Sequence, residues 1–204
     1  NIDIPQELQS KRWFANLEGS LESGDTQALL QELVVFNSVP ALRQFRNQID
    51  LAGVALANNH ITDTQALEQT THLLDELDMP YVGANENLST SGEPLLLDDN
   101  GTPIVLLNFG WEAIGCPIAR KNRAGVNPLI RDRVIQQVKA AKMQHLSRKL
   151  VVFLHWNYEL EKYPQPFDRG LSKNLIDHGA DAVIGCHAHR PLGIETYKEK
   201  PIVY

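Results

Sequence analysis

The chain has 204 residues and a formal net charge of −6 at pH 7, and 43% of its residues are hydrophobic and 22% charged. These values fit one domain, residues 1–204, that is large enough to bury a core without metal or disulfide support. The negative charge and the lack of a basic run argue against nucleic acid as a partner, and two cysteines make no disulfide framework.

The sequence contains no apolar run of transmembrane length and no signal-peptide pattern. It begins at Asn1 without a methionine, and its last residues, Pro201 to Tyr204, resemble an unfinished strand, so we expect a fragment of a longer protein. Localisation stays open, because a membrane-anchored, an extracytoplasmic and a cytoplasmic parent protein are all compatible with the sequence.

The first apolar run, residues 13–15, leads into a polar turn. Asn16 and Glu18 follow the run, and Gly19 permits a sharp exit of the chain. A carboxylate placed after a strand can act as a ligand at the edge of a sheet. Taken alone, the stretch fits an ordinary loop with a solvated glutamate better.

The next part of the chain predicts a strand–loop–helix unit. Residues 50–57 are apolar and suit a buried parallel strand. The strand delivers Asn58, Asn59 and His60 at its carboxyl end, which is where open α/β sheets bind ligands. Turn chemistry is the more common role for Asn58, whereas position favours function for Asn59 and His60. The elements around it are a loop at 21–32, a strand at 34–36, a helix opened by Pro40, and a helix at 64–77 capped by Asp63.

The second half of the chain alternates strands and helices. The predicted elements are strands at 79–84, 94–97, 103–108, 150–154, 182–184, 193–197 and 202–203, helices at 128–145 and 167–178, and an irregular segment at 110–127 that could wall a site. We interpret the three histidines in or beside helices, His72, His145 and His178, as structural residues.

Two further strands end in imidazoles. His155 follows the strand at 150–154, and His187 and His189 follow the strand at 182–184, two residues apart, so that both can point toward one centre. Together with Glu18 and Asn59, these histidines form a set that suits zinc, manganese or iron better than calcium or magnesium. Cys186 is expected to point into the core, with a thiolate ligand as the open alternative.

The motifs Asn16-Leu-Glu-Gly19, Ala57-Asn-Asn-His60, His155-Trp156 with Tyr158-Glu159, and Gly179 to His189 occur in an order that resembles the CapA (poly-γ-glutamate capsule synthesis) family. That family belongs by fold to the calcineurin-like metallophosphoesterases. The resemblance covers the chain from about residue 13 to its end. It implies an α/β fold: a four-layer αββα sandwich of two mixed sheets flanked by helices, truncated here at both ends.

The resemblance also implies a dinuclear centre of divalent transition metals, Mn, Fe or Zn. Asn59, His155 and His187 would hold one metal and His189 the other, and Glu18 would stand in place of the bridging aspartate, with Asn16 as the weaker candidate. His60 would be the catalytic residue beside the leaving group. The residues expected to line the substrate pocket are Asn16, Asn58, Trp156, Tyr158 and Glu159.

The sequence departs from the superfamily in one respect. The superfamily takes its first metal ligands from an N-terminal strand that carries an aspartate, and no such strand precedes Trp13. The metal position served by His189 is therefore expected to lack part of its ligand shell, and the occupancy of the metal positions in this fragment stays open.

Two functions from different classes fit this resemblance. The first is a metal-dependent hydrolase that acts on a phosphoester-type or related bond. The second is a non-catalytic component of capsule-polymer assembly or export, which would bind an acidic polymer or membrane-associated capsule-synthesis partners through the parent protein. A relative that retains the motifs only as structure is a weaker third possibility.

Overall fold

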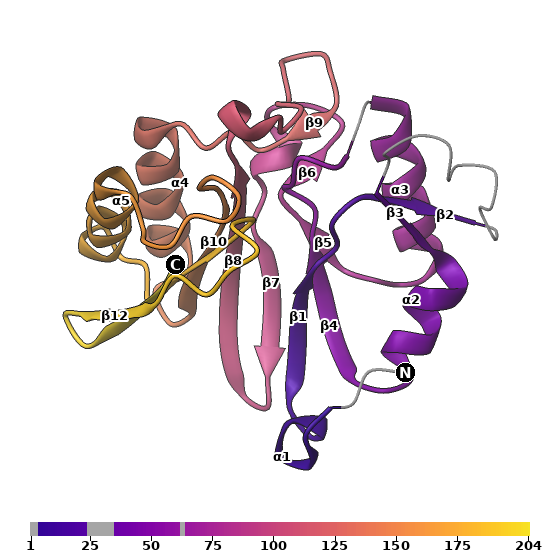
Figure 1. Ribbon diagram of the computed structural model, residues 1–204, viewed down its shortest axis with the longest axis horizontal. Helices are drawn as coiled ribbons and strands as arrows, with labels where there is room; N and C mark the ends of the chain where they lie inside the picture. The colour runs from indigo at the N-terminus through magenta and orange to yellow at the C-terminus, as the bar shows by residue number, and fades with distance from the viewer. Residues whose placement is uncertain (1–3, 24–34, 62–63) are drawn as a thin grey trace.

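The computed structural model describes residues 4–23, 35–61 and 64–204 as four layers. In Figure 1, helices α4 and α5 lie outside a six-stranded sheet, a three-stranded sheet faces that sheet, and helices α2 and α3 cover the far side. This arrangement confirms the predicted αββα sandwich. Asp63, the predicted helix cap, lies outside the described residues, and so does residue 34 of the strand predicted at 34–36.

The smaller sheet has the order β1-β4-β5, formed by Arg12–Asn16, Asp50–Ala55 and Tyr81–Val82. All of its pairings are parallel, so of the two main sheets only the larger is mixed. Its helices are α2 (Val39–Arg46) and α3 (Thr64–Glu76). Buried β4 confirms the predicted parallel strand, and the buried leucines of α3 explain the helical spacing in the sequence.

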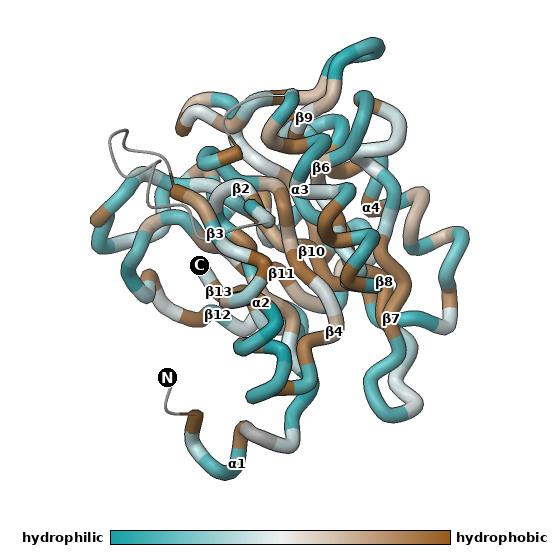
Figure 2. The backbone as a smooth tube through the Cα atoms, turned by 90° about the vertical axis from the view of Figure 1, so that its right-hand side faces the viewer, coloured by the Kyte–Doolittle hydropathy of each residue, from teal (hydrophilic) through white to brown (hydrophobic). Residues whose placement is uncertain are grey.

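The larger sheet has the order β12-β13-β11-β10-β8-β7. Its strands, in chain order, are β7 (Leu95–Asp99), β8 (Thr102–Gly110), β10 (Lys149–His155), β11 (Ala182–Cys186), β12 (Ile194–Tyr197) and β13 (Lys200–Val203). Strands β8, β10, β11 and β13 run parallel, so their carboxyl ends share one rim. Figure 2 shows the hydrophobic residues concentrated in these central strands.

Helices α4 (Arg131–Gln144) and α5 (Pro166–Asp177) cover the outer face of this sheet. The helix predicted from residue 128 begins three residues later because residues 127–130 continue along the end of β8. Leu129 N–H donates to Gly110 at 2.9 Å, and Gly110 forms a parallel bridge with Pro128. None of the described helices is long and apolar enough to cross a membrane.

The strand predicted at 79–84 is divided between two sheets. Residues 81–82 join the three-stranded sheet, and β6 (Ala84–Asn85) pairs antiparallel with β9 (Gly125–Val126). Gly83 makes the change of direction at φ +96°, and a β-carbon there would lie 2.0 Å from Asn108 Oδ1. Only glycine fits this turn.

A second small sheet was not predicted from the sequence. β2 (Ser20–Glu22) pairs parallel with β3 (Phe36–Ser38), although the sequence predicts a loop at 21–32 and a strand at 34–36. Ser20 and Leu21 are buried against α3, since the Leu21 N–H donates to Thr70 Oγ1 at 2.9 Å. The remaining short helices are α1 (Gln6–Gln9), η2 (Thr90–Gly92) and η3 (Glu112–Ile114).

Candidate metal centre

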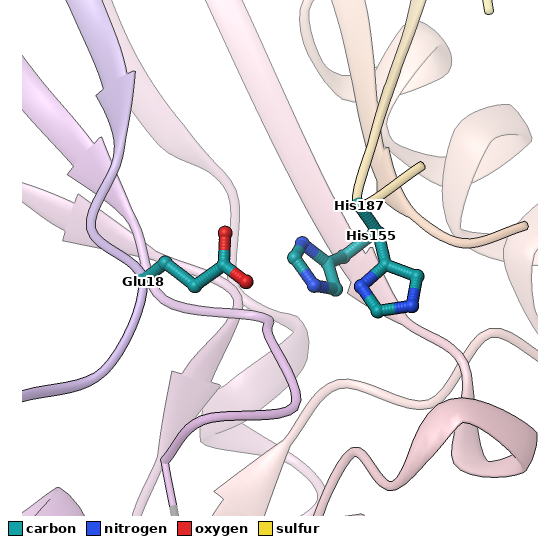
Figure 3. Close-up of side chains that lie close together, drawn as sticks. All are labelled: Glu18, His155 and His187. Atoms are coloured by element: carbon teal, nitrogen blue, oxygen red, sulfur yellow. The ribbon is translucent and has the colours of Figure 1, made fainter. Parts of the chain in front are cut away.

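Ligand-type side chains from both main sheets meet at the carboxyl rim. Glu18 follows β1, Asn59 follows β4, His155 ends β10 and His187 follows β11. Figure 3 shows the Glu18 carboxylate and the two imidazoles directed toward a common space, and their ligand atoms all lie within 4.8 Å of one another. His155 Nε2 also lies 2.8 Å from Asn59 Oδ1. Neighbouring ligands of one ion are about 3 Å apart when each bond is about 2.1 Å long.

Glu18 is oriented by the turn that carries it. The Asn16 side-chain amide donates to Glu18 Oε2 at 3.1 Å, and Gly19 leaves the turn at φ +100°. The other oxygen, Oε1, is buried and accepts no hydrogen bond. Oε1 lies 3.5 Å from His60 Nε2 and 3.9 Å from His189 Nε2, so Glu18 faces these two imidazoles as well.

Cys186 does not point away from the site, contrary to the expectation from the sequence. Its Sγ lies 3.0 Å from His155 Nδ1 and 3.6 Å from the Leu154 carbonyl oxygen, to which the thiol donates. Burial raises the pKa of the Cys186 thiol. Among the described residues, Cys186 belongs to neither group of candidate metal ligands. A thiol sulfur beside Nδ1 can accept a hydrogen bond from the Nδ1–H group, and this tautomer would leave the Nε2 lone pair free for a metal.

The buried histidines are held in their neutral form. Burial, followed by the nearby His187, lowers the pKa of His155 to about 3. Burial also lowers the pKa of His187, against a smaller opposite effect of Glu159. Neutral imidazole is the form that binds metals.

This shift predicts that the metal-free protein loses stability in acid. A histidine has a pKa near 6.5 in the unfolded chain, so below that pH the unfolded state binds a proton that folded His155 does not take up until about pH 3. Protonation of His155 therefore does not lower the free energy of unfolding above pH 6.5, and it lowers that free energy progressively as the pH falls from 6.5 toward 3. Urea unfolding in the presence of a chelator should show about 2 kcal/mol less stability at pH 5 than at pH 7 from this residue.

The same comparison on two variants isolates His155. His155→Asn should remove most of this pH dependence, whereas His72→Asn should retain it, because His72 is an exposed helix residue that pairs with Glu76. An unchanged pH dependence in His155→Asn would contradict the assignment.

The side chains of this donor set are close enough together to hold a metal ion. Seven buried side-chain atoms of the described residues have no hydrogen-bond partner, and two of them, Glu18 Oε1 and His187 Nδ1, belong to this donor set, although buried polar atoms in proteins are nearly always paired. One carboxylate, one amide oxygen and two neutral imidazoles are ligands for zinc, manganese or iron. A bound cation would satisfy the two unpaired atoms.

The buried side chain of Asn58 holds two ligand-bearing loops together. Asn58 donates to the carbonyls of Leu17 and Leu56 at 2.8 and 3.2 Å, and its Oδ1 accepts from the N–H groups of Gly19 and His60 at 3.4 and 3.0 Å. Asn58 thus ties the Glu18 turn to the Asn59 loop.

Asn108, which was not among the residues predicted from the sequence, joins the two main sheets just below the site. Its Oδ1 accepts from Ala57 N–H at 2.8 Å, and its amide donates to the Phe153 carbonyl at 3.2 Å. The sequence feature that could have identified Asn108 is its position as a polar residue directly after the apolar run 104–107.

The predicted pocket residues fall into two groups. Asn58 and Trp156 are 0% and 1% exposed: Asn58 bonds to backbone, and Trp156 packs in the core of the larger sheet. Their place in a substrate pocket stays a prediction. Tyr158 and Glu159 are exposed at the mouth of the site, and Asn16 contacts Glu18. The Tyr158 ring packs edge-on against Trp111, with centroids 5.4 Å apart.

The other histidines lie in or beside helices, and the basic residues Arg120, Lys121 and Arg123 form a cluster in the irregular segment at 110–127. His178 ends α5 and its Nδ1 bonds to the Asn174 carbonyl at 2.7 Å, while His145 is the C-cap of α4. Arg120 forms a 3.0 Å ion pair with Glu112, which takes one charge of the cluster at 120–123 away from any ligand.

Several known proteins are similar to this chain over most of its length. The family model of the bacterial capsule synthesis protein PGA_cap matches residues 6–204. The chain is 31% identical over 153 residues to "Capsule biosynthesis protein CapA" of Bacillus anthracis, covering 73% of this chain and 37% of that protein. It is 33% identical over 180 residues to a "Probable polyglutamine synthesis accessory protein" of Mycobacterium tuberculosis, covering 82% and 46%. The chain thus spans less than half the length of these relatives.

A solved structure supports the fold. The 5′-nucleotidase precursor from Thermus thermophilus superposes with a TM-score of 0.51 at 17% identity, over 77% of this chain and 30% of that one. At this identity the likeness concerns the fold alone.

Proposed function

Because the chain belongs to the PGA_cap family of bacterial capsule synthesis proteins, we propose that it takes part in capsule or poly-γ-glutamate biosynthesis as a metal-dependent hydrolase. The bond cleaved is a phosphoester or a related bond, in a phosphoester substrate or an acidic polymer. The observation that carries the proposal is the convergence of Glu18, Asn59, His155 and His187 from four strand ends on one buried space. The names of the two capsule and polyglutamine relatives support the biological role.

Each side chain has a separate task in this proposal. Glu18, Asn59, His155 and His187 would hold one divalent ion, and His189 would face a second. When bound, such ions polarise a phosphoryl oxygen and generate hydroxide near neutral pH. Asn16 keeps the Glu18 carboxylate turned toward the site through its 3.1 Å hydrogen bond.

His60 is proposed as the catalytic acid. It follows the Asn59 loop, its side chain is 28% exposed, and its Nε2 lies 3.5 Å from Glu18 Oε1. The imidazole therefore stands between the metal ligands and solvent, where it can donate a proton to a leaving oxygen or stabilise the charge that develops there.

The test is metal analysis of the protein together with hydrolysis of a generic phosphodiester in the presence of Mn²⁺. His60→Gln should lower turnover by about 10²–10⁴-fold while the metal content is unchanged, because general acid catalysis contributes rate and not metal affinity. His72→Gln, a change on an exposed helix face, should alter neither quantity.

Two outcomes would overturn the proposal. Absence of any transition metal from the intact protein would rule out the metal-dependent mechanism. Metal at full occupancy with no turnover, and with binding of an acidic polymer instead, would favour the assembly or export component over the hydrolase.

A further inference from the structure

A second ligand group lies at the mouth of the site and shares one residue with the first. The ligand atoms of Glu159, His187 and His189 also lie within 4.8 Å of one another. Glu159 is exposed and the His189 side chain is 51% exposed, whereas His187 is only 6% exposed and His155 is fully buried. The outer group thus lies between solvent and the inner group of Glu18, His155 and His187.

The two turns that carry the outer group are fixed to each other. The Leu160 N–H donates to the Ala188 carbonyl at 2.9 Å, which joins the turn after β10 to the turn after β11. Four residues of these turns have positive φ: Asn157 (+71°), Leu160 (+61°), His187 (+94°) and His189 (+53°). Such conformations cost of order 1–3 kcal/mol each and persist only where the surroundings impose them.

His187 connects the outer and inner groups. Its Nδ1 is buried and has no hydrogen-bond partner, although the residue is almost entirely enclosed. Its ring centroid lies 4.9 Å from that of His155 and 5.9 Å from that of His189. The imidazole therefore stands midway between a buried ligand and an exposed one.

We infer that Glu159, His187 and His189 form an entry position, which takes a divalent metal ion from solvent and passes it to the inner position through the shared ligand His187. This inference rests on the proposed function, because it assumes that the inner group holds a metal. Nothing in the four-strand convergence itself assigns a metal role to Glu159.

Physical reasons favour a stepwise route. An ion that enters a buried site must give up its water, and each lost water has to be replaced by a protein ligand. Glu159 offers a carboxylate at the surface, where its charge raises the local concentration of cations. Exchange of Glu159 and His189 for Glu18 and His155 would then move the ion to the inner position, and His189 would afterwards face the second ion of the proposed function.

The experiment follows the uptake of Co²⁺ by the metal-free protein in stopped flow, using the visible absorption of the bound ion. Glu159→Gln should slow both association and dissociation by about tenfold and leave the equilibrium affinity unchanged, since an entry residue affects the path and not the final site. Glu18→Gln should instead weaken the affinity, because Glu18 belongs to the inner group.

Glu161→Gln is the matched control. It removes the same charge two residues along the same segment, and Glu161 is not among the residues of either ligand group. Equal slowing by both variants, or an unchanged rate in Glu159→Gln, would overturn the entry position, and so would a loss of affinity in Glu159→Gln as large as that in Glu18→Gln. Failure of the unmodified protein to bind Co²⁺ would instead count against the proposed function itself.

Discussion

Replacement of His187 by alanine should reduce the affinity for Mn²⁺ or Zn²⁺ by about a hundredfold or more. A structural zinc site in proteins is worth about 10–16 kcal/mol shared among its ligands, so one lost imidazole costs about 3 kcal/mol. His187 belongs to both ligand groups, and no other residue of the described chain does. Its loss should therefore affect the metal more than the loss of any residue that serves one group.

Calorimetric titration of the metal-free protein measures this effect. His178→Ala is a suitable control, because His178 bonds to the Asn174 carbonyl at the end of α5, away from the carboxyl rim. Circular dichroism should show that both variants keep the fold. If His187→Ala bound the ion as tightly as the original chain, the assignment of the ligands would be wrong.

The largest expected effect on stability concerns Asn58. Asn58→Ala would leave the Leu17 carbonyl and the N–H groups of Gly19 and His60 without the partners they have now. A buried polar group without a partner costs about 1–3 kcal/mol, so we expect a loss of about 3 kcal/mol in the free energy of unfolding after partial relaxation. Because these bonds tie Glu18 to Asn59, metal affinity should fall as well.

Urea unfolding of three proteins checks this prediction. Asn47→Ala changes an exposed residue at the end of α2 and should stay within about 0.5 kcal/mol of the original chain. Asn58→Asp keeps the acceptor for Gly19 and His60 but loses the donor to Leu17, and it should be destabilised too. A loss below about 1 kcal/mol in Asn58→Ala would mean that the loops are held by other contacts.

The sequence predicted the strands that carry the site because those strands are buried. Residues 50–55, 149–155 and 182–186 are flanked by other strands of their sheets, so their apolar runs are uninterrupted and their ends are marked by polar residues. Parallel pairing then places those ends on one rim, and this is why His155 and His187 could be assigned to the same place before any geometry was known.

Other features depend on pairing between distant residues and leave little local signal. The strand at 20–22 exists because residues 36–38 lie beside it, and the division at Gly83 exists because Asn108 approaches the backbone there. The burial of Asn58 and Trp156 has the same origin, since composition alone cannot tell which polar or aromatic side chains of a loop turn inward.

Cys186 and Glu159 show most clearly which contacts of the site the sequence alone does not predict. The sequence predicts Cys186 as a small core residue, and only the register between β10 and β11, which sets His155 opposite Cys186, brings its sulfur to the imidazole. The sequence predicts Glu159 as a pocket residue, and only the bond between Leu160 and Ala188 shows that it lies beside His187 and His189.

The central claim is that the carboxyl rim holds a transition metal between β1, β4, β10 and β11. Anomalous diffraction from crystals grown with Mn²⁺ tests it most directly. We predict a maximum about 2.2 Å from His155 Nε2 and Asn59 Oδ1, within bonding distance of Glu18 and His187. A maximum elsewhere on the molecule, or none at this rim, would contradict the claim.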